Sequence, residues 1–223
     1  MHKRKIRSFV SRGRMTLGQL HALKVLGPRY CLRVEDGLLD FTLAFGRNSD
    51  VIMDIGFGTG DSLLAFAQAH PENNYLGVEV YAVGVGTLLT KLEQTALTNI
   101  RIYQSDVLDV LNQCIKDESL SGINIFFPDP WPKRKHHKRR LIQPDFIALV
   151  VRKLKSGGFL HLATDWQHYA THMMKVISQV MELRNEAGEG QFSIERRARP
   201  ATRFERRGER EGRHIWDLYF IKC

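Results

Sequence analysis

The sequence contains little cysteine and no long hydrophobic run. Its three cysteines, Cys31, Cys114 and Cys223, are widely separated and form no C-x-x-C pair, so the sequence indicates neither a disulfide framework nor a zinc site. No apolar stretch approaches the roughly 20 residues of a membrane span, and the basic N-terminus is not followed by an apolar segment. We therefore expect a soluble, cytoplasmic protein with no membrane partner and no metal ion.

Acidic residues are also missing from the first fourteen positions, which carry six Lys and Arg. Residues 15–132 hold seven basic against fourteen acidic residues, whereas residues 133–140 carry six cations and no acid, and the whole chain has a net charge of +9. An acidic centre with separate basic segments is the distribution expected of a protein that grips a polyanion. Nucleic acid is the leading partner, although a basic charge can also serve solubility alone.

The length of 223 residues and the 43% hydrophobic content suit one α/β core. Apolar strand patterns alternate with helical ones, which predicts a doubly wound, mostly parallel sheet. The expected strands are 51–55, 75–80, 100–104, 123–127 and 159–163, and the expected helices are 61–69, 86–97, 143–154 and 168–183.

Both ends of the chain have their own patterns. Residues 1–14 have no apolar period and predict a flexible basic arm, followed by a single domain over residues 15–223. Thr16 is placed to cap a short helix over residues 15–26, which would end at Gly27-Pro28. Residues 192–195 and 214–221 predict a C-terminal antiparallel strand pair, separated by an Arg-rich run.

A glycine-rich turn follows the first of these buried strands. The segment Asp54-Ile55-Gly56-Phe57-Gly58-Thr59-Gly60 would let the backbone turn sharply and approach a ligand at the N-terminus of the next helix. The spacing Gly-x-Gly-x-Gly lacks the third glycine of the dinucleotide motif, so pyrophosphate is not the favoured ligand. Glycine-rich first turns are common in doubly wound sheets, so the loop alone does not settle the ligand.

Three carboxylates lie at or just after the carboxyl ends of the first three strands. Glu79 would lie beside the glycine loop, where it could hold both hydroxyls of a ribose. Asp54 would repel phosphate but suits the amino group and sulfonium of S-adenosylmethionine. Asp106 could contact an adenine ring or could simply cap the helix that begins at Val107, and the sequence leaves both roles open.

A proline-rich turn ends the strand over residues 123–127. Proline cannot remain in a central strand, so Pro128-Asp129-Pro130-Trp131-Pro132 must form a stiff turn at the carboxyl edge of the sheet. Open α/β sheets bind ligands at this edge. We therefore expect Asp129 to be held rigidly beside the ligand site at the glycine loop, with Trp131 as a stacking face. Asp165 is expected at the same edge of the sheet.

The basic run Lys133-Arg134-Lys135-His136-His137-Lys138-Arg139-Arg140 follows this turn directly. Six cations so close together repel one another, so a binding role explains them better than folding does. The two histidines lack partners at metal-ligand spacing and are interpreted as part of the same anion-binding surface.

Together these motifs resemble the bacterial tRNA (guanine-N(7)-)-methyltransferase family. The resemblance rests on the glycine loop, Gly77-Val78-Glu79-Val80, Phe127 to Lys133, Lys138-Arg139-Arg140-Leu141, and Thr202-Arg203-Phe204-Glu205 followed by Gly208. It covers nearly the whole chain, including Arg7 to Val10 and Gly13 to Thr16. It implies a class I methyltransferase sheet that uses S-adenosylmethionine to modify a guanine in the variable loop of tRNA.

The resemblance also implies residue roles. Asp54, Glu79, Asp106 and Asp129 would contact the methyl donor, with Asp129 as the catalytic residue as well. Substrate contacts would come from Lys133, Asp165, Thr202, Arg203, Phe204 and Glu205. Two positions depart from the family pattern, which usually has Glu at the place of Asp54 and Lys at the place of Arg203.

The chemistry of nitrogen 7 agrees with this interpretation. That atom has an in-plane lone pair and no proton to lose, so the enzyme needs positioning more than a general base. Two alternatives remain. The first is a methyltransferase acting on an exocyclic amine of an RNA base, since the Asp-Pro-Trp turn loosely resembles the aromatic-proline turns of amino-methyltransferases. The second is an RNA-binding module with a degenerate donor site. The sequence does not distinguish a monomer from a homodimer.

Overall fold

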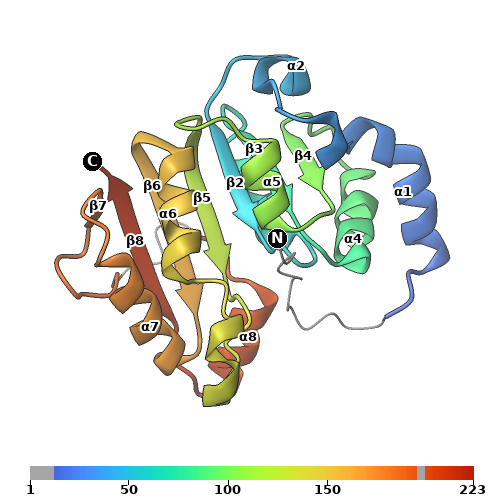
Figure 1. The fold of residues 1–223 in the computed structure, drawn as a ribbon. Helices are drawn as coiled ribbons and strands as arrows, with labels where there is room; N and C mark the ends of the chain where they lie inside the picture. Colours follow the sequence, from blue (N-terminus) through green and yellow to red (C-terminus); the bar gives the residue numbers. More distant parts are fainter. Residues whose placement is uncertain (1–12, 195–198) are drawn as a thin grey trace.

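The computed structural model describes residues 13–194 and 199–223, and these residues contain one eight-stranded sheet (Figure 1). The predicted arm over residues 1–14 lies almost entirely outside this part of the chain. The strands are β1 (Cys31–Leu32), β2 (Val51–Ile55), β3 (Asn74–Val78), β4 (Ile100–Tyr103), β5 (Leu120–Phe126), β6 (Leu154–Thr164), β7 (Leu183–Asn185) and β8 (Trp216–Lys222).

The strand order is β1-β4-β3-β2-β5-β6-β8-β7. The first six strands in this order pair in parallel, whereas β8 pairs antiparallel with both β6 and β7. The chain fills the β2-β3-β4 side first and then returns to place β5 on the other side of β2. This reversal opens a crevice at the carboxyl ends of the strands. The predicted fold class is confirmed.

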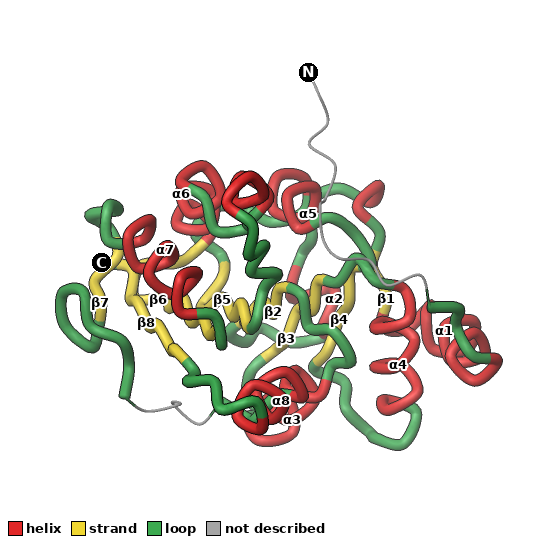
Figure 2. Tube along the Cα trace, turned by 90° about the horizontal axis from the view of Figure 1, so that it is seen from below, coloured by secondary structure: helices red, strands yellow, loops and turns green. Residues whose placement is uncertain are grey.

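Helices cover both faces of the sheet (Figure 2). One apolar core lies between the sheet and α5, α6 and α7, and a second lies between the sheet and α1, α3 and α4. The α-helices are α1 (Leu17–Tyr30), α2 (Phe41–Phe45), α3 (Asp61–Ala69), α4 (Ala82–Leu92), α5 (Val107–Gln113), α6 (Pro144–Lys153), α7 (Gln167–Ile177) and α8 (Arg203–Arg210). In the described part of the chain, no helix is long and apolar enough to cross a membrane.

The first helix is longer than expected. Thr16 does cap α1, in a capping box with Gln19, but the helix continues through Pro28 to Tyr30. The Cys31 N–H still bonds the Gly27 carbonyl beyond the proline. Tyr30 is 1% exposed, and its hydroxyl donates to the Leu97 carbonyl at 2.8 Å. This tertiary anchor outweighs the loss of one helical hydrogen bond at the proline.

The C-terminal region departs most from the expectation. Besides β6, β8 pairs antiparallel with β7 at Leu183–Asn185. Of the predicted strand over residues 192–195, Ser193 makes only an isolated bridge to Asp217, and residue 195 lies outside the described part of the chain. The Arg-rich run contains α8, whose N-terminus has a capping box between Thr202 and Glu205. The Thr-x-x-Glu spacing was therefore a helix signal, and the local capping bonds outweigh the charge repulsion among the arginines.

Close packing of α4 on the glycine loop generates a prediction for Gly84. A Cβ at this position would lie 2.3 Å from the Gly58 carbonyl oxygen, a backbone atom that cannot rotate away. We expect Gly84→Ala to lower the free energy of unfolding in urea by about 1–3 kcal/mol. Gly18→Ala is the matched control, because its Cβ would come no closer than 3.9 Å to Thr16 Oγ1 and should add up to ~1 kcal/mol to helix α1. Unchanged stability of Gly84→Ala would show that the loop is not packed as described.

Candidate active site

A cleft of about 1030 Å³ opens at the carboxyl ends of β2, β3, β4 and β5. Eleven of the residues predicted from the sequence line it: Asp54, Gly56, Gly58, Glu79, Asp106, Asp129, Trp131, Lys138, Arg139, Arg140 and Thr202. The structure thus brings the glycine loop, the proline turn and the end of the basic run to one place. Gly60, Lys133, Asp165 and Glu205 lie outside the lining.

The three glycines of the loop play two different parts. All three have left-handed φ values of 74°, 59° and 76°. A Cβ at Gly56 or Gly58 would point into open space, whereas a Cβ at Gly60 would come within 2.7 Å of Leu88 on α4. The first two glycines therefore leave room for a ligand, and Gly60 serves the packing of the loop against α4.

Glu79 holds this loop in place. Its Oε2 accepts a hydrogen bond from the Gly58 N–H at 2.8 Å, and its Oε1 accepts from the N–H groups of Val80 and Tyr81 at 2.8 and 2.9 Å. Burial raises the pKa of Glu79, although these three bonds oppose the rise. The nearby Asp129 charge raises this pKa further, which places the proline turn and the loop within electrostatic reach of each other.

Asp54 lies at the end of β2, 2% exposed. Its Oδ2 has no hydrogen-bond partner among the described residues. Burial, with a smaller contribution from the Glu79 charge, raises the pKa of Asp54 to about 7. A buried carboxylate with an unused oxygen beside an open glycine loop fits a cationic ligand. The ammonium and sulfonium of S-adenosylmethionine, the predicted donor, have that character.

Asp106 caps α5. Its Oδ1 accepts from the Leu108 N–H at 2.9 Å, so the capping role left open by the sequence is the one observed. The residue also lines the cleft, and a contact with adenine stays a prediction.

The proline turn is strained and held from behind. Phe127 and Trp131 have positive φ values of 50° and 44°, which are costly for bulky residues and often mark functional sites. The Phe127 N–H donates to the Ala163 carbonyl at 2.8 Å, and Arg140 Nε donates to the Pro130 carbonyl at 2.9 Å. The half-buried Asp129 stands between these two attachments. Its position is therefore fixed on both sides.

The basic run divides into exposed and buried members. Residues 134–139 form a 3₁₀ helix, with Lys133, Lys135 and Lys138 exposed. The Arg139 guanidinium lies 5.0 Å from the centre of the Trp131 ring. Arg140 was expected on the RNA-facing surface, but it is 2% exposed and lies 4.7 Å from the centre of the Tyr169 ring. Arg140 therefore supports the turn and presents no charge to solvent.

The histidines of the run contribute little positive charge near pH 7. Partial desolvation and the neighbouring cations lower the pKa of both His136 and His137. His136 packs edge-on against Trp131, with ring centres 5.8 Å apart. The anion-binding role of the two rings stays a prediction.

The predicted substrate contacts near the C-terminus have structural partners. Thr202 Oγ1 accepts from the Glu205 N–H at 3.1 Å, and Asp165 Oδ2 accepts from Arg213 Nη1 at 2.5 Å. Glu205 is completely buried and pairs with Arg199, a residue that the sequence did not single out. The side chains of Arg203 and Phe204 lie outside the described part of the structure.

Comparison with known proteins is consistent with this site. A family model described as a putative methyltransferase matches residues 48–218. A curated tRNA (guanine-N(7)-)-methyltransferase of Alkalilimnicola ehrlichii is 52% identical over 223 residues, which cover 99% of this chain and 94% of the relative. The protein of the same name from Hydrogenovibrio crunogenus is 50% identical over 220 residues, covering 98% of this chain and 92% of the relative.

Solved structures support the fold alone. The crystal structure of the 16S rRNA methyltransferase KamB superposes with a TM-score of 0.61 at 13% sequence identity, covering 83% of this chain and 95% of that one.

The raised pKa of Asp54 predicts how stability depends on pH. When the pKa of a carboxyl is higher in the folded chain, its contribution to the free energy of unfolding is fully present below its unfolded pKa of about 4. That contribution is lost as the pH rises towards about 7. Without donor present, we expect the unfolding free energy of the wild type, relative to Asp54→Asn, to fall by about 2–3 kcal/mol between pH 5 and pH 8. Urea unfolding of both proteins at the two pH values measures this difference, and a difference that does not change with pH would place the titration elsewhere.

Proposed function

Since the chain belongs to the tRNA (guanine-N(7)-)-methyltransferase family, we propose that it transfers a methyl group from S-adenosylmethionine to nitrogen 7 of a guanine in the variable loop of tRNA. The observation that carries the proposal is the position of Asp129. This carboxylate lines the same cleft as the glycine loop and Glu79, on a turn fixed at Phe127 and Pro130. A base and a methyl donor could both reach it there.

The reaction places few demands on acid–base chemistry. S-adenosylmethionine, when bound, supplies a methyl group already activated by its sulfonium. Nitrogen 7 of guanine presents a lone pair and loses no proton. The contribution of the protein is therefore to align the base with the donor and to exclude other geometries.

Asp129 acts as an orienting group and an electrostatic partner in this proposal. Its carboxylate accepts a hydrogen bond from the amide edge of guanine. Its negative charge offsets the positive charge that develops on the ring as the methyl group arrives. The strain at Phe127 and Trp131 and the support from Arg140 keep Asp129 where it can do both.

The donor and the tRNA would use different parts of the site. In this proposal, the donor occupies the open space at Gly56 and Gly58, Asp54 would pair with its positive groups, and Glu79 would hold its ribose; all four residues line the cleft, and Asp54 Oδ2 has no partner among the described residues. Of the exposed lysines of the basic run, Lys138 lines the cleft, and all three would suit the phosphates of tRNA. Asp165 and Thr202 are proposed substrate contacts at the same edge.

The exposed lysines predict the salt dependence of tRNA binding. Replacing Lys133, Lys135 and Lys138 by Ala should reduce the slope of log K against log salt by about 2–3, since each lost phosphate contact removes roughly 0.7–0.9. Affinity for S-adenosylmethionine should not change. Fluorescence titrations of tRNA at several salt concentrations measure the slope.

A matched variant controls for net charge. It replaces three exposed lysines on other elements of the fold: Lys24, Lys116 and Lys175. Equal slopes for the two triple variants would remove the basic run from the tRNA interface.

The role of Asp129 predicts a defect confined to chemistry. Asp129→Asn keeps the shape of the side chain but brings no charge to the cationic ring. We expect single-turnover methylation to fall on the order of 10²-fold or more, about 2.7 kcal/mol of transition-state stabilisation, with folding and tRNA affinity nearly intact. Transfer of labelled methyl groups to tRNA under single-turnover conditions gives the rate.

A modified substrate tests the target atom in the same assay. tRNA with 7-deazaguanine at the target position lacks the nucleophilic nitrogen and should accept no methyl group. Normal turnover by Asp129→Asn would remove this residue from the mechanism. Methylation of the deaza substrate would instead favour an exocyclic amine as the acceptor.

A further inference from the structure

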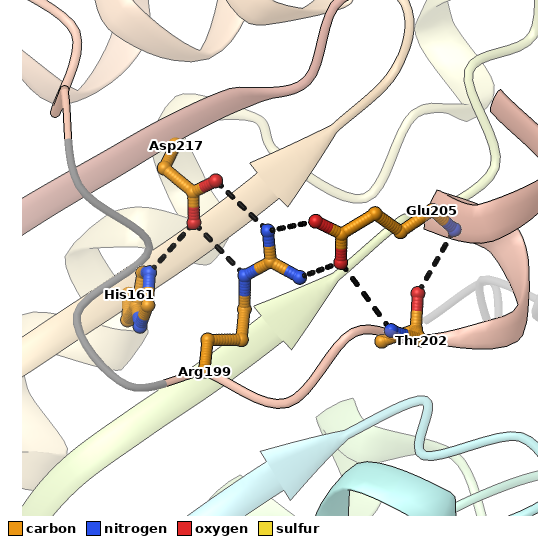
Figure 3. Close-up of polar contacts among 5 residues, drawn as sticks. All are labelled: His161, Arg199, Thr202, Glu205 and Asp217. Carbon is orange, nitrogen blue, oxygen red and sulfur yellow. Dashed lines mark hydrogen bonds and ion pairs between the residues drawn. The ribbon is translucent and has the colours of Figure 1, made fainter. Parts of the chain in front are cut away.

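A buried arginine lies between two carboxylates (Figure 3). Arg199 is 2% exposed, with its guanidinium enclosed by Asp217 on one side and Glu205 on the other. Its Nε and Nη2 donate to the two oxygens of Asp217, each at 2.9 Å. Its Nη1 and Nη2 donate to the two oxygens of Glu205 at 2.5 and 3.3 Å. Only arginine has the planar set of donors that can pair with two carboxylates in this way.

This arrangement joins the C-terminal region to β6 and to the proline turn. Asp217 lies on β8 and also bonds His161 of β6 at 2.9 Å, while Glu205 lies on α8. The guanidinium carbon is 5.4 and 5.5 Å from the ring centres of Phe126 and Phe127. Phe127 is the strained residue two positions before Asp129. Arg199 therefore contacts the base of the proline turn and the first turn of α8 at the same time.

Glu205 has no surface to offer a substrate. The residue is 0% exposed, and its carboxylate accepts from Arg199 through both oxygens. Its Oε2 also accepts from the Thr202 N–H at 3.3 Å, which completes the capping box of α8. Thr202, in contrast, lines the cleft. The charge of Glu205 is thus paired inside the protein, and its hydrogen bonds with Thr202 connect it to the cleft.

Helix α8 has a second attachment to the sheet, at Gly208. Gly208 packs so closely on Asp165, at the end of β6, that a Cβ would lie 3.1 Å from Asp165 Cβ. This contact fixes the later part of α8 against the sheet. The Arg199–Glu205 pair fixes its beginning, where Thr202 meets the cleft. The two contacts together define how α8 is seated at the carboxyl edge.

We propose that Arg199 is a positioning residue of the methyl-transfer site, and that Glu205 acts through Arg199 and not by touching the substrate. The proposal rests on the function proposed above. Buried charges in general add little net stability compared with apolar residues, but breaking one pair leaves the other charge unsatisfied. The contribution of this network is therefore geometric, because it holds Thr202 and the proline turn at a fixed separation across the cleft.

A double-mutant cycle tests the dependence of Glu205 on Arg199. Single-turnover methylation of tRNA is measured for Glu205→Gln, Arg199→Met and the double variant, below the unfolding temperature of each. We expect losses of about 10-fold and 100-fold for the single variants and about 100-fold for the double variant, because residues that act as a unit are not additive. A double variant near 1,000-fold would show independent roles and overturn the proposal.

The same proteins distinguish positioning from mere stability. If the network only stabilised the fold, each folded variant would methylate at the wild-type rate, which would also overturn the proposal. If Arg199→Met does not fold, Arg199→Lys replaces it in the cycle, since one ammonium can still pair with Asp217 but cannot bridge both carboxylates.

Glu205→Gln provides an independent measurement, because it leaves the Arg199–Asp217 pair intact. We expect a lower kcat with the KM for tRNA within about twofold of the wild type, whereas a raised KM with normal kcat would assign Glu205 to the substrate. Failure of the proposed function is recognised separately, since the wild-type protein would then produce no 7-methylguanosine in this assay.

Discussion

The site depends on one buried carboxylate that turns the backbone of two loops towards each other. Glu79 directly follows β3 and accepts hydrogen bonds from Gly58 of the glycine loop and from Val80 and Tyr81 of its own loop. Burial disfavours the charged form of Glu79, and the three N–H donors offset part of that cost. Together with the bond from the Gly56 N–H to the Val78 carbonyl, this carboxylate holds the glycine loop against the end of β3 and keeps the space at Gly56 and Gly58 open.

The proline turn is held by buried cations, whereas the glycine loop is held by a buried anion. Two buried guanidinium groups, those of Arg140 and Arg199, approach the turn from different sides. Arg140 bonds the Pro130 carbonyl, and Arg199 packs on the rings of Phe126 and Phe127. Asp129 thus sits on a short segment whose two ends are held by rigid partners, which is the condition for orienting a base with little loss of freedom.

The parallel strands and the lining of the cleft could be predicted because both follow from local patterns. Apolar runs that end in Asp54, Glu79 or Pro128 mark strands and their carboxyl ends, and parallel pairing then brings those ends together. The placement of Arg140, Arg199 and Glu205 could not be predicted in this way. A run of cations suggests solvent exposure, and only the tertiary fold supplies the Pro130 carbonyl and the Asp217 carboxylate that make burial of these charges possible. The capping box of α8 was visible in the sequence, but β7 was not, because three residues carry too little pattern.

Under the proposed function, a buried scaffold supports a cleft that would hold the cationic donor and an exposed basic segment that would contact RNA. The central claim is that this arrangement directs a methyl group to nitrogen 7 of one guanine. The most direct measurement is to treat unmodified tRNA with the purified protein and labelled S-adenosylmethionine, and then to identify the modified nucleoside and its position by mass spectrometry. The account predicts 7-methylguanosine in the variable loop and at no other position. Label on an exocyclic amine, or tRNA binding without any transfer, would contradict it.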